Sequence, residues 1–265
     1  MQDVDHATVE RAQRGDTAAM EDLLESIAPA VQRFGMRMCK NPADADDVLQ
    51  DTLLSIAQHL PAFEGRSSLS SWVFTLVRTA CGRRRRGLKN KPGESDDVLA
   101  ERPAEGPTPE EGAAGRELSK ALLGALDALS EEHREVLLLR DVEGLTAPEA
   151  AEVLGIRVDA LKSRLHRARG ALRDAMRPVL EPGAAEPRPG CPDVIHAWSR
   201  KLEGELNAID CATMEEHVAS CPSCGPACDA LRQALRLCKS ASEGPVRPEV
   251  RARVKAALQA WQVAR

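Results

Sequence analysis

The sequence predicts an all-α protein composed of small helical domains. Along most of the chain, apolar residues recur at intervals of three and four, which is the period of an amphipathic helix. The 265 residues contain no Tyr, three Phe and three Trp, and the β-branched and aromatic runs that typify strands are missing. Two Pro- and Gly-rich stretches, residues 89–115 and 179–190, divide the chain into three blocks.

The first block, residues 1–88, is expected to form a helical bundle. Asp16 can cap a helix with an apolar stripe, and Asp44 can cap the next helix after a break at residues 41–42. This next helix carries an acidic strip beside its apolar seam. A further helix starts near residues 68–70 and ends in four consecutive arginines. Arginines clustered there suit contacts to phosphate, and the alternative is a solvated charge run.

The second block, residues 116–178, predicts a helix-turn-helix. Thr146 and Glu149 form a capping box at the start of a short helix. Gly155 tolerates the positive φ that a tight turn between helices requires. Residues 156–173 then alternate between a buried stripe and a cationic face. Such a helix suits the major groove of DNA, and the alternative is an ordinary core helix with a solvated basic side.

Six of the eight cysteines lie in the third block, residues 191–240. Four potential ligands follow the pattern Cys191-x25-His217-x3-Cys221-x2-Cys224. The last three fall on one face of a helical turn, and Cys191 can complete a tetrahedron from an earlier helix. Three thiolates and one imidazole suit a closed zinc site, and soft sulfur ligands also bind copper or cadmium.

The other cysteines allow several interpretations. Cys211, Cys228 and Cys238 can form a second thiolate-rich site, extend the first site or act as redox thiols. Cys39 and Cys81 stand alone in the sequence and are expected to be small buried hydrophobes.

Composition excludes several classes of protein. The net charge of -5 excludes a uniformly basic nucleic-acid coat, so DNA binding must come from local patches. The chain shows neither a signal peptide nor eighteen consecutive apolar residues, which predicts a cytoplasmic protein without membrane contact. No grouping of His and carboxylates predicts a catalytic pocket, and the metal pattern leaves no open coordination position, so we do not expect an enzyme.

Two segments in succession resemble the extracytoplasmic-function (ECF) sigma factors of the sigma-70 family, the small initiation factors of bacterial RNA polymerase. Residues 44–86 resemble their region 2. Residues 117–177 resemble their region 4, with Leu-Ser-Glu-Glu at 129–132 and Lys-Ser-Arg-Leu-His-Arg-Ala-Arg at 162–169. The resemblance implies two partners, promoter DNA and the β′ and β subunits of core RNA polymerase. It also implies that the acidic linker threads through the polymerase cleft, although a passive tether is the alternative.

The resemblance assigns roles to individual residues. It implies docking on the β′ clamp helices through Asp44, Asp46, Asp47, Val48, Gln50 and Asp51. It implies contact with the −10 element through Phe63, Arg66, Trp72, Arg78, Arg83, Arg84, Arg85 and Arg86. Helical spacing nevertheless favours a core position for Trp72. The resemblance implies contact with the −35 element through Arg157, Lys162, Ser163, Arg164, Arg167 and Arg169. Relatives often have an N-capping residue or Pro in place of Arg157.

The third block resembles the zinc-binding fold of anti-sigma factors. A subgroup of ECF sigma factors carries a fused Cys-rich domain, and this resemblance implies activation by copper, zinc or cadmium. We hypothesise that the block masks the sigma domains or the polymerase surface without metal, or with the wrong one, and that metal repacks it.

Residues 241–265 predict a basic amphipathic helix. It either covers the acidic strip of the first block and competes with polymerase, or it packs on the metal-binding bundle. For the whole chain, the competing function is a free-standing helix-turn-helix repressor or activator that senses metal or thiol state.

Overall fold

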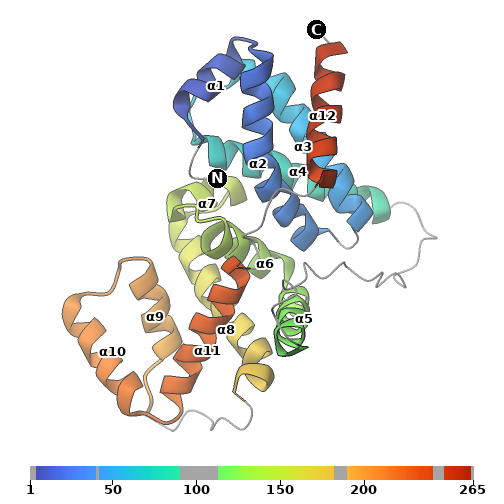
Figure 1. Cartoon of the computed structure of the whole chain (residues 1–265). Coiled ribbons are helices and arrows are strands. Elements are labelled where there is room, and N and C mark those ends of the chain that lie inside the picture. Colours follow the sequence, from blue (N-terminus) through green and yellow to red (C-terminus); the bar gives the residue numbers. More distant parts are fainter. Residues whose placement is uncertain (1–3, 40–41, 90–112, 182–189, 241–247, 264–265) are drawn as a thin grey trace. The chain divides into compact units, whose positions relative to one another are not determined.

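The computed structural model describes residues 4–39, 42–89, 113–181, 190–240 and 248–263. Within these ranges all regular structure is helical, which confirms the predicted all-α class. The helices gather in two compact units, and Figure 1 labels them in chain order. Among the described helices, none is both long and apolar enough to cross a lipid bilayer.

The first unit contains the N-terminal helices and the C-terminal helix. Its elements are α1 (His6–Gln13), α2 (Thr17–Met38), α3 (Pro42–His59), a 3-10 turn (Leu60–Ala62), α4 (Leu69–Lys89) and α12 (Pro248–Val263). The predicted cap of α2 is confirmed, because the Asp16 carboxylate accepts a hydrogen bond from the Ala19 N–H at 3.1 Å. In the core, the rings of Phe34 and Phe74 lie 5.6 Å apart.

The start of α3 differs from the prediction. The helix begins at Pro42, so Asp44 lies in its first turn and does not cap it. Proline is well suited to the first turn of a helix, where no N–H donor is needed. The helix therefore starts at Pro42, before Asp44. Asp44 is buried, and it accepts a hydrogen bond of 2.7 Å from Nε of Arg84 on α4.

The two cysteines that stand alone in the sequence are neighbours in space. Cys39 at the end of α2 and Cys81 on α4 are buried, as expected, and their sulfur atoms lie 3.7 Å apart. The two cysteines are 42 residues apart in the sequence, so sequence pattern could not predict that they are neighbours. They meet because α2 packs against α4.

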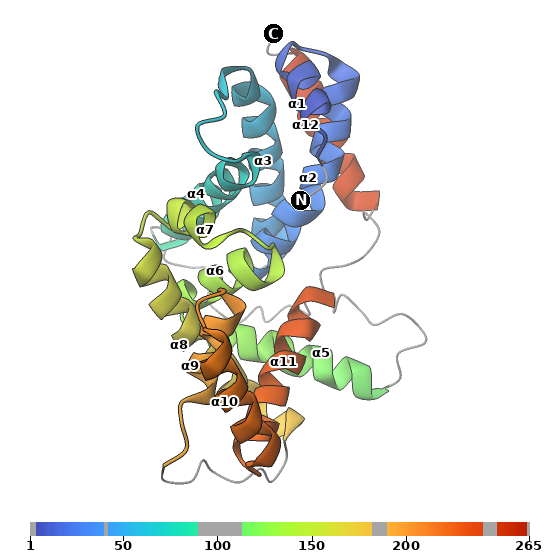
Figure 2. The ribbon, with the colours of Figure 1, turned by 90° about the vertical axis from the view of Figure 1, so that its left-hand side faces the viewer.

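The second unit combines the helix-turn-helix, apart from residues 152–155, with the Cys-rich block. Its elements are α5 (Ala113–Ala128), α6 (Glu131–Leu137), a π-turn (Leu138–Val142), α7 (Ala147–Leu154), α8 (Val158–Leu180), α9 (Val194–Leu202), α10 (Ala208–Ser220) and α11 (Cys224–Ser240). Helix α8 packs against α6, α9 and α11, and Figure 2 shows α9 alongside it. Helix α8 therefore packs directly on the appended domain, by which we mean residues 190–240.

The local geometry of the helix-turn-helix is as predicted. The Glu149 carboxylate accepts a hydrogen bond of 2.7 Å from the Thr146 N–H, and the Thr146 hydroxyl accepts one of 3.4 Å from the Glu149 N–H. Gly155 has a φ of 66°, the left-handed conformation that glycine adopts without strain. Arg157 stands at the N-cap of α8 and makes no side-chain capping bond there, in line with its unusual residue type.

Candidate metal centre and DNA-binding helix

The four predicted metal ligands converge in the appended domain. Cys191 precedes α9, His217 lies in the last turn of α10, Cys221 ends α10, and Cys224 begins α11. The ligand atoms of these side chains all lie within 4.8 Å of one another. A cluster of this kind brings three segments of the chain to one point.

The donor set fits a tetrahedral metal ion. Sγ of Cys191 and Sγ of Cys221 lie 3.8 Å apart, close to the edge of about 3.8 Å that zinc–sulfur bonds of about 2.3 Å give a tetrahedron. Nε2 of His217 is buried and has no hydrogen-bond partner among the described residues. A buried imidazole nitrogen is costly without a partner, and a metal ion would supply one.

The two thiols around Pro222 differ in acidity. Backbone N–H groups of Cys224 and Ser223 point at the Cys221 sulfur and lower the pKa of that thiol to about 6. Burial, together with the neighbouring sulfurs, raises the pKa of Cys224 to about 12. Without metal at neutral pH, Cys221 is therefore a thiolate while Cys224 holds its proton.

The sequence interpretation of this site was wrong in two respects. His217, Cys221 and Cys224 do not share one helix face, because the chain leaves α10 at Cys221, whose ψ is 119°. Proline follows Cys221 and disfavours a helical conformation for the residue before it. Cys191 likewise lies before α9 rather than on a helix.

Gly225 is a functional position that sequence reasoning missed. A Cβ atom built on Gly225 would lie 2.8 Å from the backbone oxygen of Val218, so α10 and α11 approach too closely for any side chain there. Its only sequence signal is its place directly after Cys224. The close approach brings the ligand atoms of His217 and Cys224 into one cluster.

We predict that Gly225→Ala destabilises the appended domain by about 1–3 kcal/mol, because a backbone atom must move to admit the methyl group. Metal affinity should fall as well, measured by competition with a chelator of known affinity. Gly170→Ala on α8 is the control, since open space surrounds that position. Equal metal affinity in both variants would contradict this role for Gly225.

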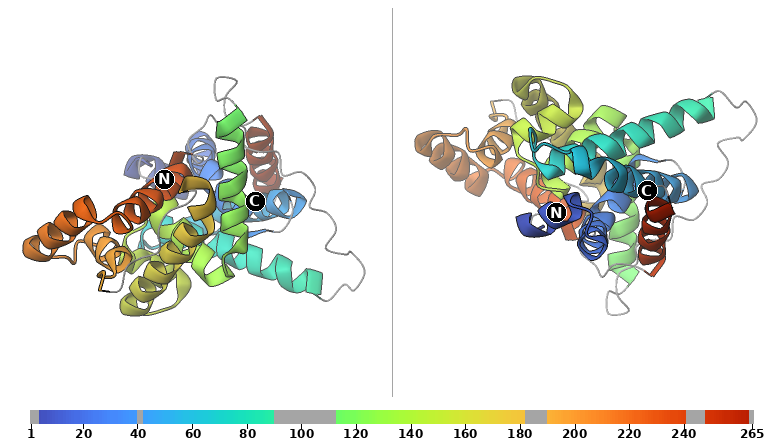
Figure 3. Two further views of the ribbon diagram at one scale, coloured as in Figure 1. Left: turned by 90° about the horizontal axis from the view of Figure 1, so that it is seen from below. Right: turned by 90° about the horizontal axis from the view of Figure 1, so that it is seen from above.

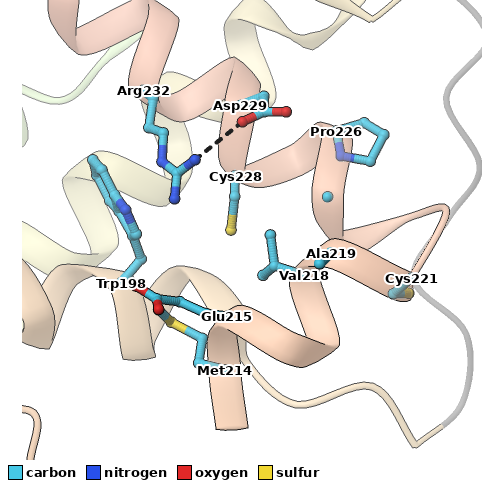
Figure 4. A pocket seen from close by; sticks show the side chains of 11 residues that line it. Trp198, Met214, Glu215, Val218, Ala219, Cys221, Pro226, Cys228, Asp229 and Arg232 are labelled. Carbon is cyan, nitrogen blue, oxygen red and sulfur yellow. Dashed lines mark hydrogen bonds and ion pairs between the residues drawn. The ribbon is translucent and has the colours of Figure 1, made fainter. Parts of the chain in front are cut away.

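The other three cysteines do not gather into a second cluster among the described residues. Cys211 lies 3.6 Å from the carboxylate of Glu215, and Cys238 is buried on α11. Cys228 lies with Trp198 and Val218 around a cavity of about 540 Å³, close to the ion pair between Asp229 and Arg232 (Figure 4). The extension of the first site and the redox role both stay untested.

The cationic face of α8 meets carboxylates of the appended domain. Nζ of Lys162 pairs with Glu205, and the His166 ring lies 3.8 Å from the Asp193 carboxylate and 4.6 Å from the ring of His196. Burial lowers the pKa of His166. The appended domain therefore places carboxylates next to Lys162 and His166 on the cationic face of α8.

Arg169 is buried, whereas the sequence placed it on the solvent-facing cationic side. Its guanidinium bonds Asp141 at 2.6 Å, Ser199 at 2.6 Å and Glu203 at 3.2 Å. Burial alone would lower the pKa of Arg169, but the two carboxylates outweigh it and raise the pKa. Glu203 also accepts a bond of 2.5 Å from Arg140, so it bridges two arginines.

The remaining residues predicted for the −35 element keep some exposure. Arg157, Ser163 and Arg167 are exposed, while Arg164 is partly buried and pairs with Glu132 at 3.2 Å. Their role in DNA contact stays a prediction.

The first unit brings together part of the residues predicted for the −10 element. The rings of Phe63 and Trp72 lie 5.0 Å apart, and both side chains are half-buried, so Trp72 is neither a full core residue nor a free platform. Arg84 pairs with Asp44 and Asp47, and its side chain stays 42% exposed. The side chains of Arg66, Arg83 and Arg86 are exposed, and those of Arg78 and Arg85 are partly buried.

The acidic helix α3 divides into buried and accessible positions. Asp44 and Val48 are buried, so neither lies on the surface of α3. Asp51 is exposed, and three further residues are partly exposed, namely Asp46, Asp47 and Gln50.

Three family models match successive parts of the chain. Sigma-70 region 2 matches residues 14–91, sigma-70 region 4 matches residues 119–172, and a zinc-finger family matches residues 191–225. The RNA polymerase sigma factor CarQ of Myxococcus xanthus is 33% identical over 171 residues, which is 63% of this chain and 95% of CarQ. This chain belongs to the extracytoplasmic-function sigma factors.

Other sigma factors show the same extent of likeness. The ECF sigma factor SigE of Mycolicibacterium smegmatis is 32% identical over 168 residues, 60% of this chain and 63% of SigE. The sigma factor RpoE of Bartonella quintana, solved with its anti-sigma factor NepR, superimposes with a TM-score of 0.50 at 28% identity, covering 59% of this chain and 95% of RpoE.

A sigma factor binds RNA polymerase and directs it to promoters, so this chain is a transcription factor and not an enzyme. Membership also decides against the free-standing repressor or activator that the helix-turn-helix allowed. The zinc-finger match at residues 191–225 and the Cys/His cluster both lie beyond the two matched sigma regions.

Proposed function

We propose that this sigma factor is controlled by metal through its appended domain. While the four ligands are held together, the appended domain stays folded on α8 and shields the region 4 surface that binds the −35 element. The observation that carries this proposal is the pairing of Lys162 with Glu205 and the burial of Arg169 by Glu203.

The pairing is electrostatically suited to inhibition. Region 4 binds DNA with cations on α8, and carboxylates seated on these cations repel phosphate and occupy their donors. The His196 and Asp193 side chains cover His166 in the same way. Promoter DNA can reach the face only after α9 moves away, which makes masking and DNA binding mutually exclusive.

The metal would supply a cross-link between the start of α9, the end of α10 and the start of α11. A zinc-type ion fits this tetrahedral arrangement and stabilises the masked state. An ion that prefers fewer thiolates, such as copper(I), would draw the four ligands apart and shift the population to the unmasked state. Cadmium, which also takes thiolates, belongs in the same comparison.

We also propose the division of contacts within the sigma regions. Region 2 would dock on polymerase through Asp46, Asp47, Gln50 and Asp51. It would contact the −10 element through the Phe63–Trp72 pair, where stacking of an unpaired base is worth about 1–3 kcal/mol. The exposed arginines of α4 would contact phosphate there. Region 4 would read the −35 element through Lys162, Ser163, Arg164 and Arg167.

The test replaces the two carboxylates that cover α8. We expect the double variant Glu203→Gln with Glu205→Gln to bind −35 promoter duplex about tenfold more tightly, because Lys162 is freed for phosphate contacts and the appended domain is held less tightly on α8. Electrophoretic mobility shift and run-off transcription with core polymerase, at graded zinc, copper and cadmium, measure the effect. The zinc-loaded double variant should be as active as the released wild-type chain.

The control is Glu215→Gln with Glu216→Gln, which changes net charge equally and pairs within the appended domain only. An equal gain in promoter affinity in both double variants would show that the effect comes from net charge and not from the contacts on α8. Wild-type activity that ignores every metal, and that already equals the activity of the Glu203/Glu205 double variant, would overturn the proposed control.

A further inference from the structure

We infer that the surface formed by α2 and α3 of region 2 accepts one basic amphipathic helix at a time, and that α12 of this chain occupies it in competition with RNA polymerase. This inference rests on the proposed docking of polymerase on α3 and deepens it. The proposed masking by the appended domain acts on region 4, whereas α12 acts on region 2.

The apolar side of α12 is buried in the first unit. Val254, Ala257, Leu258 and Trp261 are all at most 5% exposed, and their spacing places them on one face of the helix. The views from the front and from above both show α12 beside α2 and α3 (Figures 1 and 3). An isolated helix of 16 residues is marginal in water, so this packing is what stabilises α12.

A charged contact fixes α12 on the acidic helix. Nη1 of Arg253 donates to the side-chain oxygen of Gln50 at 2.8 Å, and its Nη2 lies 3.5 Å from the Asp46 carboxylate. Asp46 and Gln50 are one turn apart on α3. The resemblance to ECF sigma factors assigned both of them to polymerase.

The opposite side of α12 faces solvent. Arg251, Lys255 and Gln259 are exposed and polar, so this side of the helix does not require another partner to bury it. An apolar stripe flanked by cations suits packing on a pair of helices that carry acidic side chains beside an apolar surface. The α2–α3 surface and helix α12 are therefore complementary in both polarity and charge.

The consequence for polymerase follows from mass action. A helix tethered to its own site acts at an effective concentration of roughly millimolar, which a free partner must overcome. The apparent affinity for polymerase is reduced to the fraction of molecules in which α12 is displaced. The inference therefore predicts that loosening α12 strengthens polymerase binding without any change in region 2.

The experiment measures binding of the fluorescently labelled full chain to core RNA polymerase by anisotropy, without DNA and at one fixed zinc concentration. Arg253→Glu should bind about threefold more tightly, because it repels the acidic strip. Val254→Asp should bind about tenfold more tightly, because it places a charge in the apolar seam. Lys255→Glu is the control, because Lys255 is exposed on the same helix and should leave the affinity unchanged.

A synthetic peptide of residues 244–265 completes the design. Added to the Val254→Asp chain, the wild-type peptide should weaken polymerase binding again, and a peptide with Arg253→Glu should do so less. Equal or weaker binding by the Arg253 and Val254 variants, relative to wild type, overturns the competition. If no form of the chain binds polymerase, the docking role proposed for α3 fails as well.

Discussion

Replacing Cys224 by serine should abolish stoichiometric metal binding and loosen the appended domain. Cys224 is buried and packs in one cluster with Val194, Trp198 and Leu231, so its loss removes a ligand from the place where α9 and α11 meet. Structural zinc contributes about 10–16 kcal/mol of folding free energy in small zinc domains. The hydrophobic core of so small a domain is too small to supply the same stabilisation. We expect metal affinity to fall by more than about 100-fold, the upper range for changes outside the ligands themselves.

Two measurements check this expectation. Elemental analysis after dialysis should show about one metal ion per wild-type chain and none in Cys224→Ser. Hydrogen exchange should show faster exchange across α9, α10 and α11 in the variant, with α2 and α3 unchanged. Cys211→Ser is the matched control, since Cys211 lies outside the cluster. Full metal content in Cys224→Ser would refute the assigned ligand set.

Replacing Arg169 by methionine should destabilise the second unit by about 3–5 kcal/mol, the usual cost of breaking a buried ion pair from one side. The guanidinium is 2% exposed and neutralises Asp141 and Glu203, whose side chains are 11% and 5% exposed. Both carboxylates would remain buried with part of their charge unpaired. Urea unfolding, followed by circular dichroism, measures the loss.

Arg167→Met is the control for this prediction, because Arg167 is exposed on the same helix and surface substitutions usually change stability by less than about 0.5 kcal/mol. The pair also separates two roles. A residue that only contacts DNA would weaken promoter binding and leave the unfolding midpoint unchanged. That outcome for Arg169→Met would contradict its structural role and return Arg169 to the solvent-facing cationic side of α8.

Much of the fold could be read from local pattern. The caps at Asp16 and Thr146 and the turn at Gly155 depend on residues within four positions of one another, so the sequence specifies them directly. The metal ligands were likewise found by spacing, because His217, Cys221 and Cys224 lie in one short segment. Their placement on one helix face was wrong, because Pro222 interrupts the helix that the periodicity continues.

Contacts between distant segments were beyond such reasoning. The cationic face of α8 has a pattern compatible with solvent, DNA or an acidic partner, and only packing shows that Glu203 buries Arg169. The same holds for Asp44, which was predicted to cap α3 and to dock on polymerase and is instead buried and paired with Arg84 on α4. Charge complementarity indicates that opposite patches can meet, but it does not determine which ones do.

The sequence by itself determined most helices, the caps at Asp16 and Thr146, the two sigma regions and the four Cys and His side chains that cluster, because each depends on neighbouring residues or on helical periodicity. Only the tertiary structure decided which surfaces are covered: α8 by the carboxylates of the appended domain, and α3 by α12. The physical reason is that burial is a property of pairs of surfaces. An amphipathic helix encodes its own apolar face, but its partner is chosen by the whole fold.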